Sequence, residues 1–213
     1  MTAVFLDLDG TLMDSKPGIV ASLRHAFRTA GHDALADEDL TWMIGPPFSD
    51  SFERIGIADP APVLEAYRVH YQAEGMYQAA VYAGVVDMIA ALEAQGSRLY
   101  LATAKPHAYA TKITEHFGLA PSFAAEFGPE LDGTRGWKGD LLAYALERTG
   151  ETAERSVMVG DRHHDIAAGQ QVGMSTIAVT WGYGSEEEWD GAHATITSPD
   201  ELVGAIGALK LGR

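Results

Sequence analysis

Short apolar runs alternate with amphipathic segments over most of the chain. Six runs are typical of strands: residues 4–6, 98–103, 123–127, 156–160, 175–180 and, more weakly, 194–196. Apolar residues recur at helical spacing in five segments between or after them: 85–94, 106–117, 138–148, 164–172 and 199–209. Because strands and helices alternate, the pattern predicts an α/β fold, with a Rossmann-like parallel sheet and helices on both faces.

A segment without strand character interrupts this alternation after the first strand. Ser15 and Pro17 mark a helix start, and Gly31 ends that helix. From residue 37 to about 82, short helical pieces are broken by Gly45-Pro46-Pro47 and by residues 56–62. We therefore expect an all-helical domain over residues 15–82, inserted into a core domain of residues 1–14 and 83–213.

The composition limits the partners that this chain can have. Its 15 basic and 30 acidic residues give a net charge of −15, which repels nucleic acid and anionic membranes. There is no cysteine, so disulfides and thiolate metal sites are excluded. Asp7 and Asp9 interrupt the N-terminal apolar run, and no apolar stretch is long enough to span a bilayer. We expect a cytoplasmic protein that binds neither nucleic acid nor membranes; its oligomeric state is not predicted.

Two carboxylates stand at the tip of the first predicted strand. Asp7 and Asp9 follow the apolar run directly, and alternation along an extended chain puts both on one side. Gly10 then allows a sharp turn without steric cost. Asp and Gly also end strands simply as turn residues. However, Asp-x-Asp-Gly-Thr arises by chance in roughly a few per thousand chains of this length, so the pattern favours a functional site.

The stretch resembles the first motif of the haloacid dehalogenase-like (HAD) hydrolase superfamily, Asp-x-Asp-x-Thr after the first strand. Asp7, Asp9 and Thr11 take its three defined positions. The resemblance covers nearly the whole chain. It implies an α/β core in which a helical cap is inserted between the first and second motifs, as in the phosphoglycolate phosphatase and 5′-nucleotidase branch.

The predicted strand 98–103 ends in a hydroxyl group. Thr103 precedes a helix start at Pro106, and the free N–H groups of a helix N-terminus suit a phosphate. By itself, Thr103 is also consistent with a simple strand-end cap. The HAD family has Thr or Ser at this position, and Lys105 resembles its phosphoglycolate phosphatase branch. We expect substrate contacts from Gly10, Thr11, Ala104 and Lys105.

Lys138 opens the predicted helix 138–148, where the helix dipole disfavours a cation. A residue that breaks a local rule is a candidate for function, although a solvated surface lysine is equally consistent with the pattern. HAD enzymes place a Lys or Arg before their fourth motif in this way. Lys138 is the natural match, and Arg135 is the alternative.

The predicted strand 156–160 leads into Gly160-Asp161, with Asp165 one helical turn further on. Gly-Asp-x-x-x-Asp arises by chance in roughly a few per cent of chains, and it resembles the fourth HAD motif. The neighbouring His163 and His164 suggest a zinc site. Adjacent residues of a helix point in different directions, however, so these histidines cannot form a facing pair.

Carboxylates crowded together cannot all stay ionised without a cation, and oxygen ligands at a site of phosphate chemistry favour Mg²⁺. We expect the side chains of Asp7 and Asp161 to bind Mg²⁺. The resemblance adds the backbone carbonyl of Asp9. Asp165 completes the predicted metal site, where it orients Lys138 or a water molecule of the ion.

The predicted chemistry is hydrolysis of a phosphate monoester. Asp7 attacks phosphorus to form an aspartyl phosphate, while Asp9 protonates the leaving alkoxide and later activates water. Thr103 and Lys138 assist, the latter by neutralising phosphoryl oxygens. By family resemblance, dehalogenases lack the second acid and ATP-driven pumps carry Thr there. The acid at Asp9 therefore favours a phosphatase or a phosphomutase.

Other stretches narrow the substrate by resemblance. Residues 130–135 and 181–184 look like HAD 5′-nucleotidases, and residues 44–47 look like a cap loop of phosphoglycolate phosphatases. We expect the partner to be a small phosphorylated metabolite, either a nucleoside monophosphate or a phosphoglycolate-like ester. A β-phosphoglucomutase-like phosphomutase and a non-catalytic binding module are the alternatives.

Overall fold

The computed structural model describes residues 1–209 and 211–212, so residues 210 and 213 of the predicted core domain lie outside the described residues. The chain forms two compact units. The first, here called the sheet unit, comprises residues 1–13 and 81–213. The second, here called the helical unit, is Asp14–Ala80.

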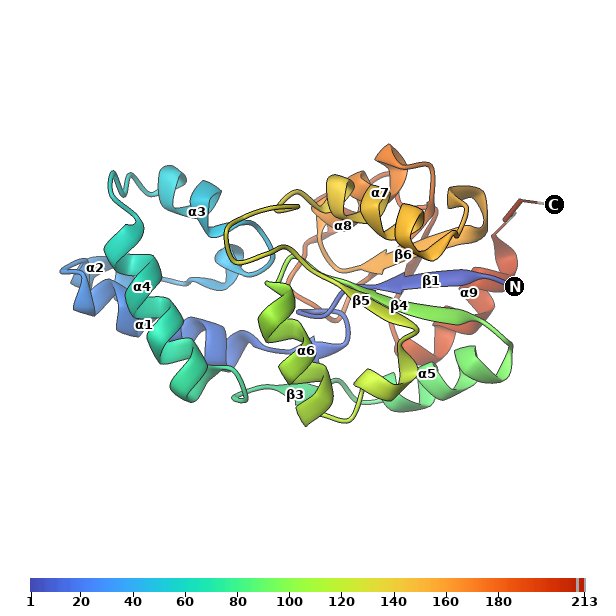
Figure 1. Cartoon of the computed structure of the whole chain (residues 1–213), viewed down its shortest axis with the longest axis horizontal. Coiled ribbons are helices and arrows are strands. Elements are labelled where there is room, and N and C mark those ends of the chain that lie inside the picture. The colour runs from blue at the N-terminus through green and yellow to red at the C-terminus, as the bar shows by residue number, and fades with distance from the viewer. Residues whose placement is uncertain (210, 213) are drawn as a thin grey trace. The chain divides into compact units, whose positions relative to one another are not determined.

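A six-stranded sheet forms the centre of the sheet unit (Figure 1). Its strands are β1 (Ala3–Leu6), β4 (Arg98–Ala102), β5 (Ala125–Phe127), β6 (Ser156–Gly160), β7 (Ser175–Val179) and β8 (Ala194–Ile196). They pair in the order β5-β4-β1-β6-β7-β8, and every pair is parallel. The predicted parallel sheet is therefore confirmed, with β1 between β4 and β6.

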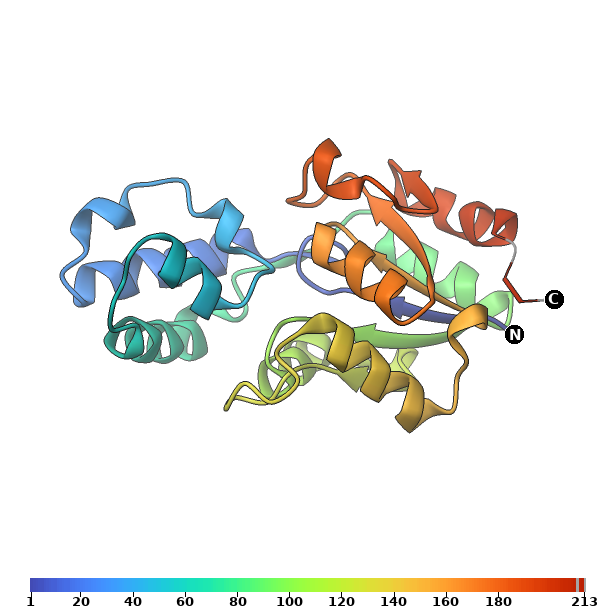
Figure 2. The same cartoon turned by 90° about the horizontal axis from the view of Figure 1, so that it is seen from above.

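Helices cover both faces of this sheet. They are α5 (Val85–Ala94), α6 (His107–His116), α7 (Lys138–Thr149), α8 (His163–Gln171) and α9 (Leu202–Ala208). Figures 1 and 2 show α7 and α8 on one face and α5 and α9 on the other. Alternate strand residues point to opposite faces. Phe5 of β1 stacks on Tyr100 and belongs to one buried cluster with Leu142 of α7 and Ala168 of α8.

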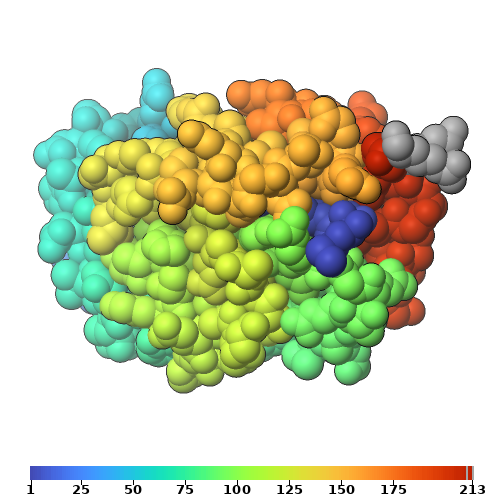
Figure 3. Space-filling view, turned by 45° about the vertical axis from the view of Figure 1, so that its right-hand side comes forward, coloured from blue at the N-terminus to red at the C-terminus, as the bar shows by residue number. Residues whose placement is uncertain are grey.

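The amino ends of the strands meet at the opposite edge from the predicted site. The N-terminal residues reach the surface between the segment that leads into β4 and the C-terminal segment (Figure 3), and Met1 is 77% exposed. Because all six strands run parallel, their carboxyl ends lie together at the other edge. In open α/β sheets, that edge binds the ligand.

The helical unit contains α1 (Lys16–Thr29), α2 (Asp33–Ala36), α3 (Phe48–Arg54) and α4 (Ala61–His70), which continues into a π-helical turn at Tyr71–Gly75. Its core is aromatic: the rings of Phe48 and Phe52 contact Tyr67 and Phe27 respectively. The two strands β2 (Met13–Asp14) and β3 (Ala80–Val81) pair where the chain passes between the units.

Two local details differ from the sequence pattern. The expected last helix over 199–209 is present, but its first turn, Pro199–Glu201, is 3₁₀ and α9 ends at Ala208. An Asp-Gly pair favours a short hairpin loop, but at Asp132-Gly133 no strand of the described chain lies between β5 and α7. Instead, the Asp132 carboxylate accepts the Thr134 N–H at 2.9 Å and closes a compact loop. No helix among the described residues has the length and apolarity that crossing a bilayer requires; the cytoplasmic location stays a prediction.

Candidate active site

The site begins where β1 ends. The Asp7 N–H donates to the Val159 carbonyl at 3.0 Å, which continues the pairing of β1 with β6 by one residue. The backbone then turns through Gly10, whose φ of +88° favours glycine. A side chain at Gly10 would also collide with the carboxylate of Asp161. The turn therefore requires glycine, and it leaves Asp7 and Asp9 buried at the carboxyl edge of the sheet.

Lys138 is a buried cation at the start of α7, not a solvated surface residue. Its Nζ donates to Asp7 Oδ1 at 2.6 Å and also to Asp165 Oδ1. Burial favours the neutral amine, but the carboxylates of Asp165 and Asp7 outweigh it and raise the pKa of Lys138 above its usual value. The lysine is therefore an ammonium that joins the first strand to α8.

Asp161 and Asp165 lie on the segment that leaves β6. Asp161 follows the strand directly, and Asp165 lies in the first turn of α8, where its Oδ2 accepts the Arg162 N–H at 3.0 Å. Both side chains are fully buried. The carboxylate thus caps the N-terminus of α8 with one oxygen and contacts Lys138 with the other.

Asp7, Asp161 and Asp165 each place one carboxylate oxygen within 4.8 Å of the other two. Burial raises the pKa of Asp7 to about 6, and burial together with the neighbouring carboxylates raises that of Asp161 well above its usual value. One ammonium faces three buried carboxylates, so the cluster is short of positive charge. These oxygen donors fit a hard divalent cation such as Mg²⁺.

The second group of residues surrounds Asp9. Lys105 Nζ lies 3.0 Å from Asp9 Oδ2, and both side chains are buried. The Thr103 hydroxyl accepts the Lys105 N–H at 3.1 Å, which leaves its own proton available for a further acceptor. Asp9 Oδ1 is buried and has no hydrogen-bond partner among the described residues. The structure therefore brings Thr103, Lys105 and Asp9 together beside the Asp7 cluster, with one carboxylate oxygen uncommitted.

The remaining predicted substrate contacts flank these groups. Thr11 is buried, and its Oγ1 lies 3.5 Å from Asp161 Oδ1. Gly10 packs against the same carboxylate. Ala104, between Thr103 and Lys105, is partly exposed. Their contact with substrate stays a prediction.

Three side chains named as alternatives are not among the clustered carboxylates, although His164 Nε2 lies 3.9 Å from Asp165 Oδ1. Arg135, the alternative to Lys138, pairs with Glu130 and lies 4.4 Å from the ring centroid of Tyr144. His163 is exposed and contacts Glu188 at 3.0 Å. Burial, with Lys138 next in effect, lowers the pKa of His164 to about 3. Among the described residues, no cluster of possible metal ligands contains a histidine.

A further set of hydrogen bonds, from residues 181–189, surrounds the site and was not predicted from the sequence. The indole N–H of Trp189 donates to the Asp161 carbonyl at 2.8 Å, and that of Trp181 donates to the Thr11 carbonyl at 3.0 Å. The Tyr183 N–H donates to Asp161 Oδ2 at 2.6 Å. The sequence signal for these contacts is the aromatic–glycine stretch 181–184, which directly follows a predicted strand.

The pKa of Asp7 predicts how pH affects stability. Its folded pKa of about 6 lies above the usual 3.8, so protonated Asp7 adds stability below about pH 4 that is lost as pH rises through about 6. The loss is about 3 kcal/mol. A cation favours the ionised carboxylates, so the Tm gained on adding Mg²⁺ to chelator-treated protein should grow between about pH 5 and pH 7. Thermal unfolding with EDTA and with Mg²⁺ across this pH range measures the gain in Tm. A gain in Tm that shrinks as the pH rises would contradict the prediction.

The chain is similar in sequence and in fold to several known proteins. A family model described as haloacid dehalogenase-like hydrolase matches residues 4–179. The chain is 38% identical over 188 residues to a 5′-nucleotidase of Pseudomonas aeruginosa, covering 87% of this chain and 85% of the relative. It is also 38% identical over 209 residues to the tyrosine-protein kinase PtkA of Mycobacterium tuberculosis, covering 96% and 72%. The crystal structure of a predicted phosphatase from Clostridium acetobutylicum superposes with a TM-score of 0.93 at 33% identity, covering 98% and 99%.

Proposed function

The chain belongs to the haloacid dehalogenase-like hydrolases and is an enzyme of the phosphatase type, and on that premise we propose that it hydrolyses small phosphate monoesters through a phosphorylated Asp7, with Mg²⁺ as cofactor. One observation carries the proposal. The buried carboxylate of Asp7 lies at the end of β1, 2.6 Å from an ammonium and beside Asp161 and Asp165. A nucleophile and charge-neutralising groups are thus held at one point.

In the first step, an Asp7 carboxylate oxygen attacks phosphorus in line, and the bond from phosphorus to the leaving oxygen breaks. Asp7 is mostly ionised at neutral pH, because its pKa is about 6. Lys138 holds Asp7 Oδ1 and supplies positive charge to the phosphoryl oxygens. A divalent cation held by Asp7, Asp161 and the Asp9 carbonyl would add further charge neutralisation there.

Asp9 serves as the acid and then as the base. Its Oδ2 is held by Lys105 at 3.0 Å, which leaves Oδ1 to give a proton to the departing alkoxide. The resulting carboxylate then takes a proton from the water that attacks phosphorus and releases Asp7. Thr103, whose hydroxyl already accepts the Lys105 N–H, has its proton available for a phosphoryl oxygen.

Asp9→Asn tests the acid directly. Asn cannot donate a carboxyl proton, so alkyl phosphates should lose about 10²-fold or more in kcat/KM, within the usual range for general acid–base catalysis. A nitrophenyl ester needs little protonation of its leaving group and should lose much less. Rates with matched alkyl and nitrophenyl phosphates measure the difference. Equal losses with both esters would mean that Asp9 does not protonate the leaving group.

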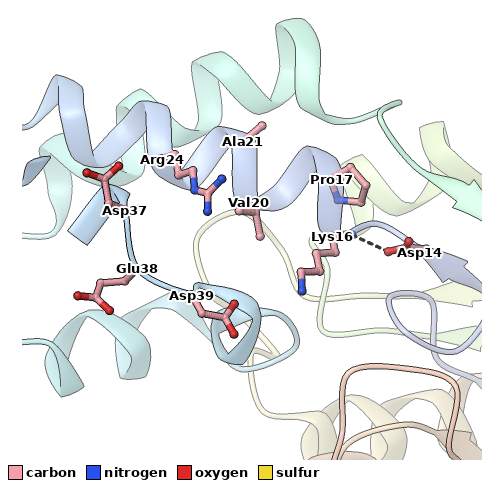
Figure 4. Close-up of a pocket in the computed structure, with 9 residues that line it drawn as sticks. All are labelled: Asp14, Lys16, Pro17, Val20, Ala21, Arg24, Asp37, Glu38 and Asp39. Carbon is pink, nitrogen blue, oxygen red and sulfur yellow. Dashed lines mark hydrogen bonds between the residues drawn. The ribbon is translucent and has the colours of Figure 1, made fainter. Parts of the chain in front are cut away.

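In this proposal, the helical unit is the cap domain expected for residues 15–82, and the cap selects the substrate. It carries a cavity of about 590 Å³ with charged walls. Figure 4 shows Lys16 and Arg24 projecting from α1, with Asp37, Glu38 and Asp39 on the loop after α2. Side chains of both signs suit a polar substrate body better than an apolar one.

A panel of phosphate esters with Mg²⁺ tests the activity. We expect inorganic phosphate to be released from nucleoside monophosphates or from small carboxylated esters such as phosphoglycolate. The resemblance of this chain to a 5′-nucleotidase supports the first class, and the likeness of residues 44–47 to a cap loop of phosphoglycolate phosphatases supports the second. No phosphate release from any ester would contradict the proposal. Isomer formation from a sugar phosphate, without phosphate release, would instead indicate a phosphomutase.

A further inference from the structure

One surface loop contacts the proposed cation site but takes no part in the proposed chemistry. Residues 181–189, here called the 181–189 loop, follow β7 and end in a 3₁₀ turn at Glu186–Trp189. The loop lies within the sheet unit, and Trp181 and Trp189 are both partly buried.

The loop holds Asp161 by both its side chain and its backbone. The Tyr183 N–H donates to Asp161 Oδ2 at 2.6 Å, and the Trp189 indole N–H donates to the Asp161 carbonyl at 2.8 Å. Within the described part of the chain, Asp161 Oδ1 has one hydrogen-bond contact, from the Thr11 hydroxyl at 3.5 Å. One carboxylate oxygen is therefore committed to the loop, and Oδ1 is the oxygen left for a cation.

The same loop holds the turn that follows β1. The Trp181 indole N–H donates to the Thr11 carbonyl at 3.0 Å. Gly182 lies so close to this turn that an added Cβ would collide with the Gly10 carbonyl and with Asp161. Glycine at 182 thus lets the loop backbone lie directly against both segments.

A third contact reaches the start of α8. Glu188 Oε2 accepts from the Arg162 guanidinium at 2.8 Å and from the His163 N–H at 3.2 Å. Arg162 and its neighbours carry the chain from Asp161 to Asp165. The 181–189 loop therefore contacts the turn after β1 and the first three residues of the Asp161–Asp165 segment.

We propose that the 181–189 loop is the positioning element of the cation site, and that Trp189 and Trp181 are its positioning residues because their N–H groups fix Asp161 and the Gly10 turn. This inference rests on the proposed function. Groups that hydrogen-bond to metal ligands typically change metal affinity or activity by about 10–100-fold when replaced.

Trp189→Phe keeps the ring and removes only the N–H that the Asp161 carbonyl accepts. We expect the dissociation constant for Mg²⁺, measured from the rise in Tm with Mg²⁺ concentration, to increase by about tenfold or more. At saturating Mg²⁺, kcat should return to within about threefold of the unchanged enzyme. Trp181→Phe should shift the dissociation constant in the same direction. Trp42→Phe, the same change in the helical unit, is the matched control and should leave it unchanged.

A loop that served only folding would lower the Tm of the metal-free variants without changing their Mg²⁺ dissociation constants, and that result would overturn the inference. If Trp189→Phe does not fold, Trp181→Phe decides by the same criterion. Should the unchanged protein show no stabilisation by Mg²⁺, the proposed cation site itself fails and the inference falls with it. If Mg²⁺ stabilises the unchanged protein and the tryptophan variants to an equal extent, only the role of the loop is overturned.

Discussion

Asp7→Asn should lower phosphatase turnover by on the order of 10⁴-fold or more, because the amide cannot act as the nucleophile that accepts the phosphoryl group. The fold should survive the change. Asp7 shares the Lys138 ammonium with Asp165 and also has a carboxylate oxygen within 4.8 Å of one of Asp161, so replacing Asp7 relieves repulsion in the metal-free protein. Phosphate release with Mg²⁺ and the Tm in EDTA measure the two effects.

Asp140→Asn is the matched control for this variant. Asp140 lies in the first turn of α7, close in sequence to Lys138, but its side chain is exposed. The turnover of Asp140→Asn should match that of the unchanged enzyme. If Asp7→Asn retains more than a few per cent of the activity, another group attacks phosphorus and the proposed mechanism is wrong.

Lys138→Met should reduce both activity and stability. Removing the ammonium leaves Asp7 and Asp165 buried without their cation, and breaking a buried pair in this way costs about 3–5 kcal/mol. Loss of a cation that stabilises phosphoryl-transfer charge costs about 10³-fold or more in kcat. The loss of stability should be smaller at pH 5 than at pH 7, because Asp7, with its pKa of about 6, is protonated at the lower pH.

Urea unfolding at the two pH values, in EDTA, measures the stability of Lys138→Met. Lys112→Met is the control: it removes an exposed lysine from α6 and should leave both stability and turnover nearly unchanged. Loss of activity without loss of stability would mean that Lys138 serves catalysis but that its charge does not stabilise the buried carboxylates. Full activity in Lys138→Met would exclude the lysine from the mechanism.

The sheet was predictable because its strands are short, apolar and separated by well-marked helices. The run 156–160 matches β6 and the segment 85–94 matches α5, since strongly patterned elements leave little freedom in their type. The carboxylates were predictable for a related reason. Each follows a buried strand or opens a helix next to one, and parallel topology brings such positions to one edge.

The contacts of the 181–189 loop were not predictable by the same reasoning. An indole N–H that reaches the Asp161 carbonyl from 28 residues away leaves no periodic pattern, because it depends on how an irregular loop folds back. The pairing of Lys105 with Asp9 is similar, since Lys105 was expected to contact substrate, and its buried contact with an acid comes from packing between two strand tips. Contacts of this kind can be identified only from a three-dimensional structure that defines the loops and turns after the strands.

The central claim is that Asp7 carries the phosphoryl group between the ester and water. The stereochemical course at phosphorus tests it most directly, using an ester whose phosphate is made chiral with oxygen isotopes. Two successive in-line displacements, first by Asp7 and then by water, each invert phosphorus, so this account predicts overall retention of configuration. Overall inversion would show that water attacks the ester directly, and it would contradict the role given to Asp7.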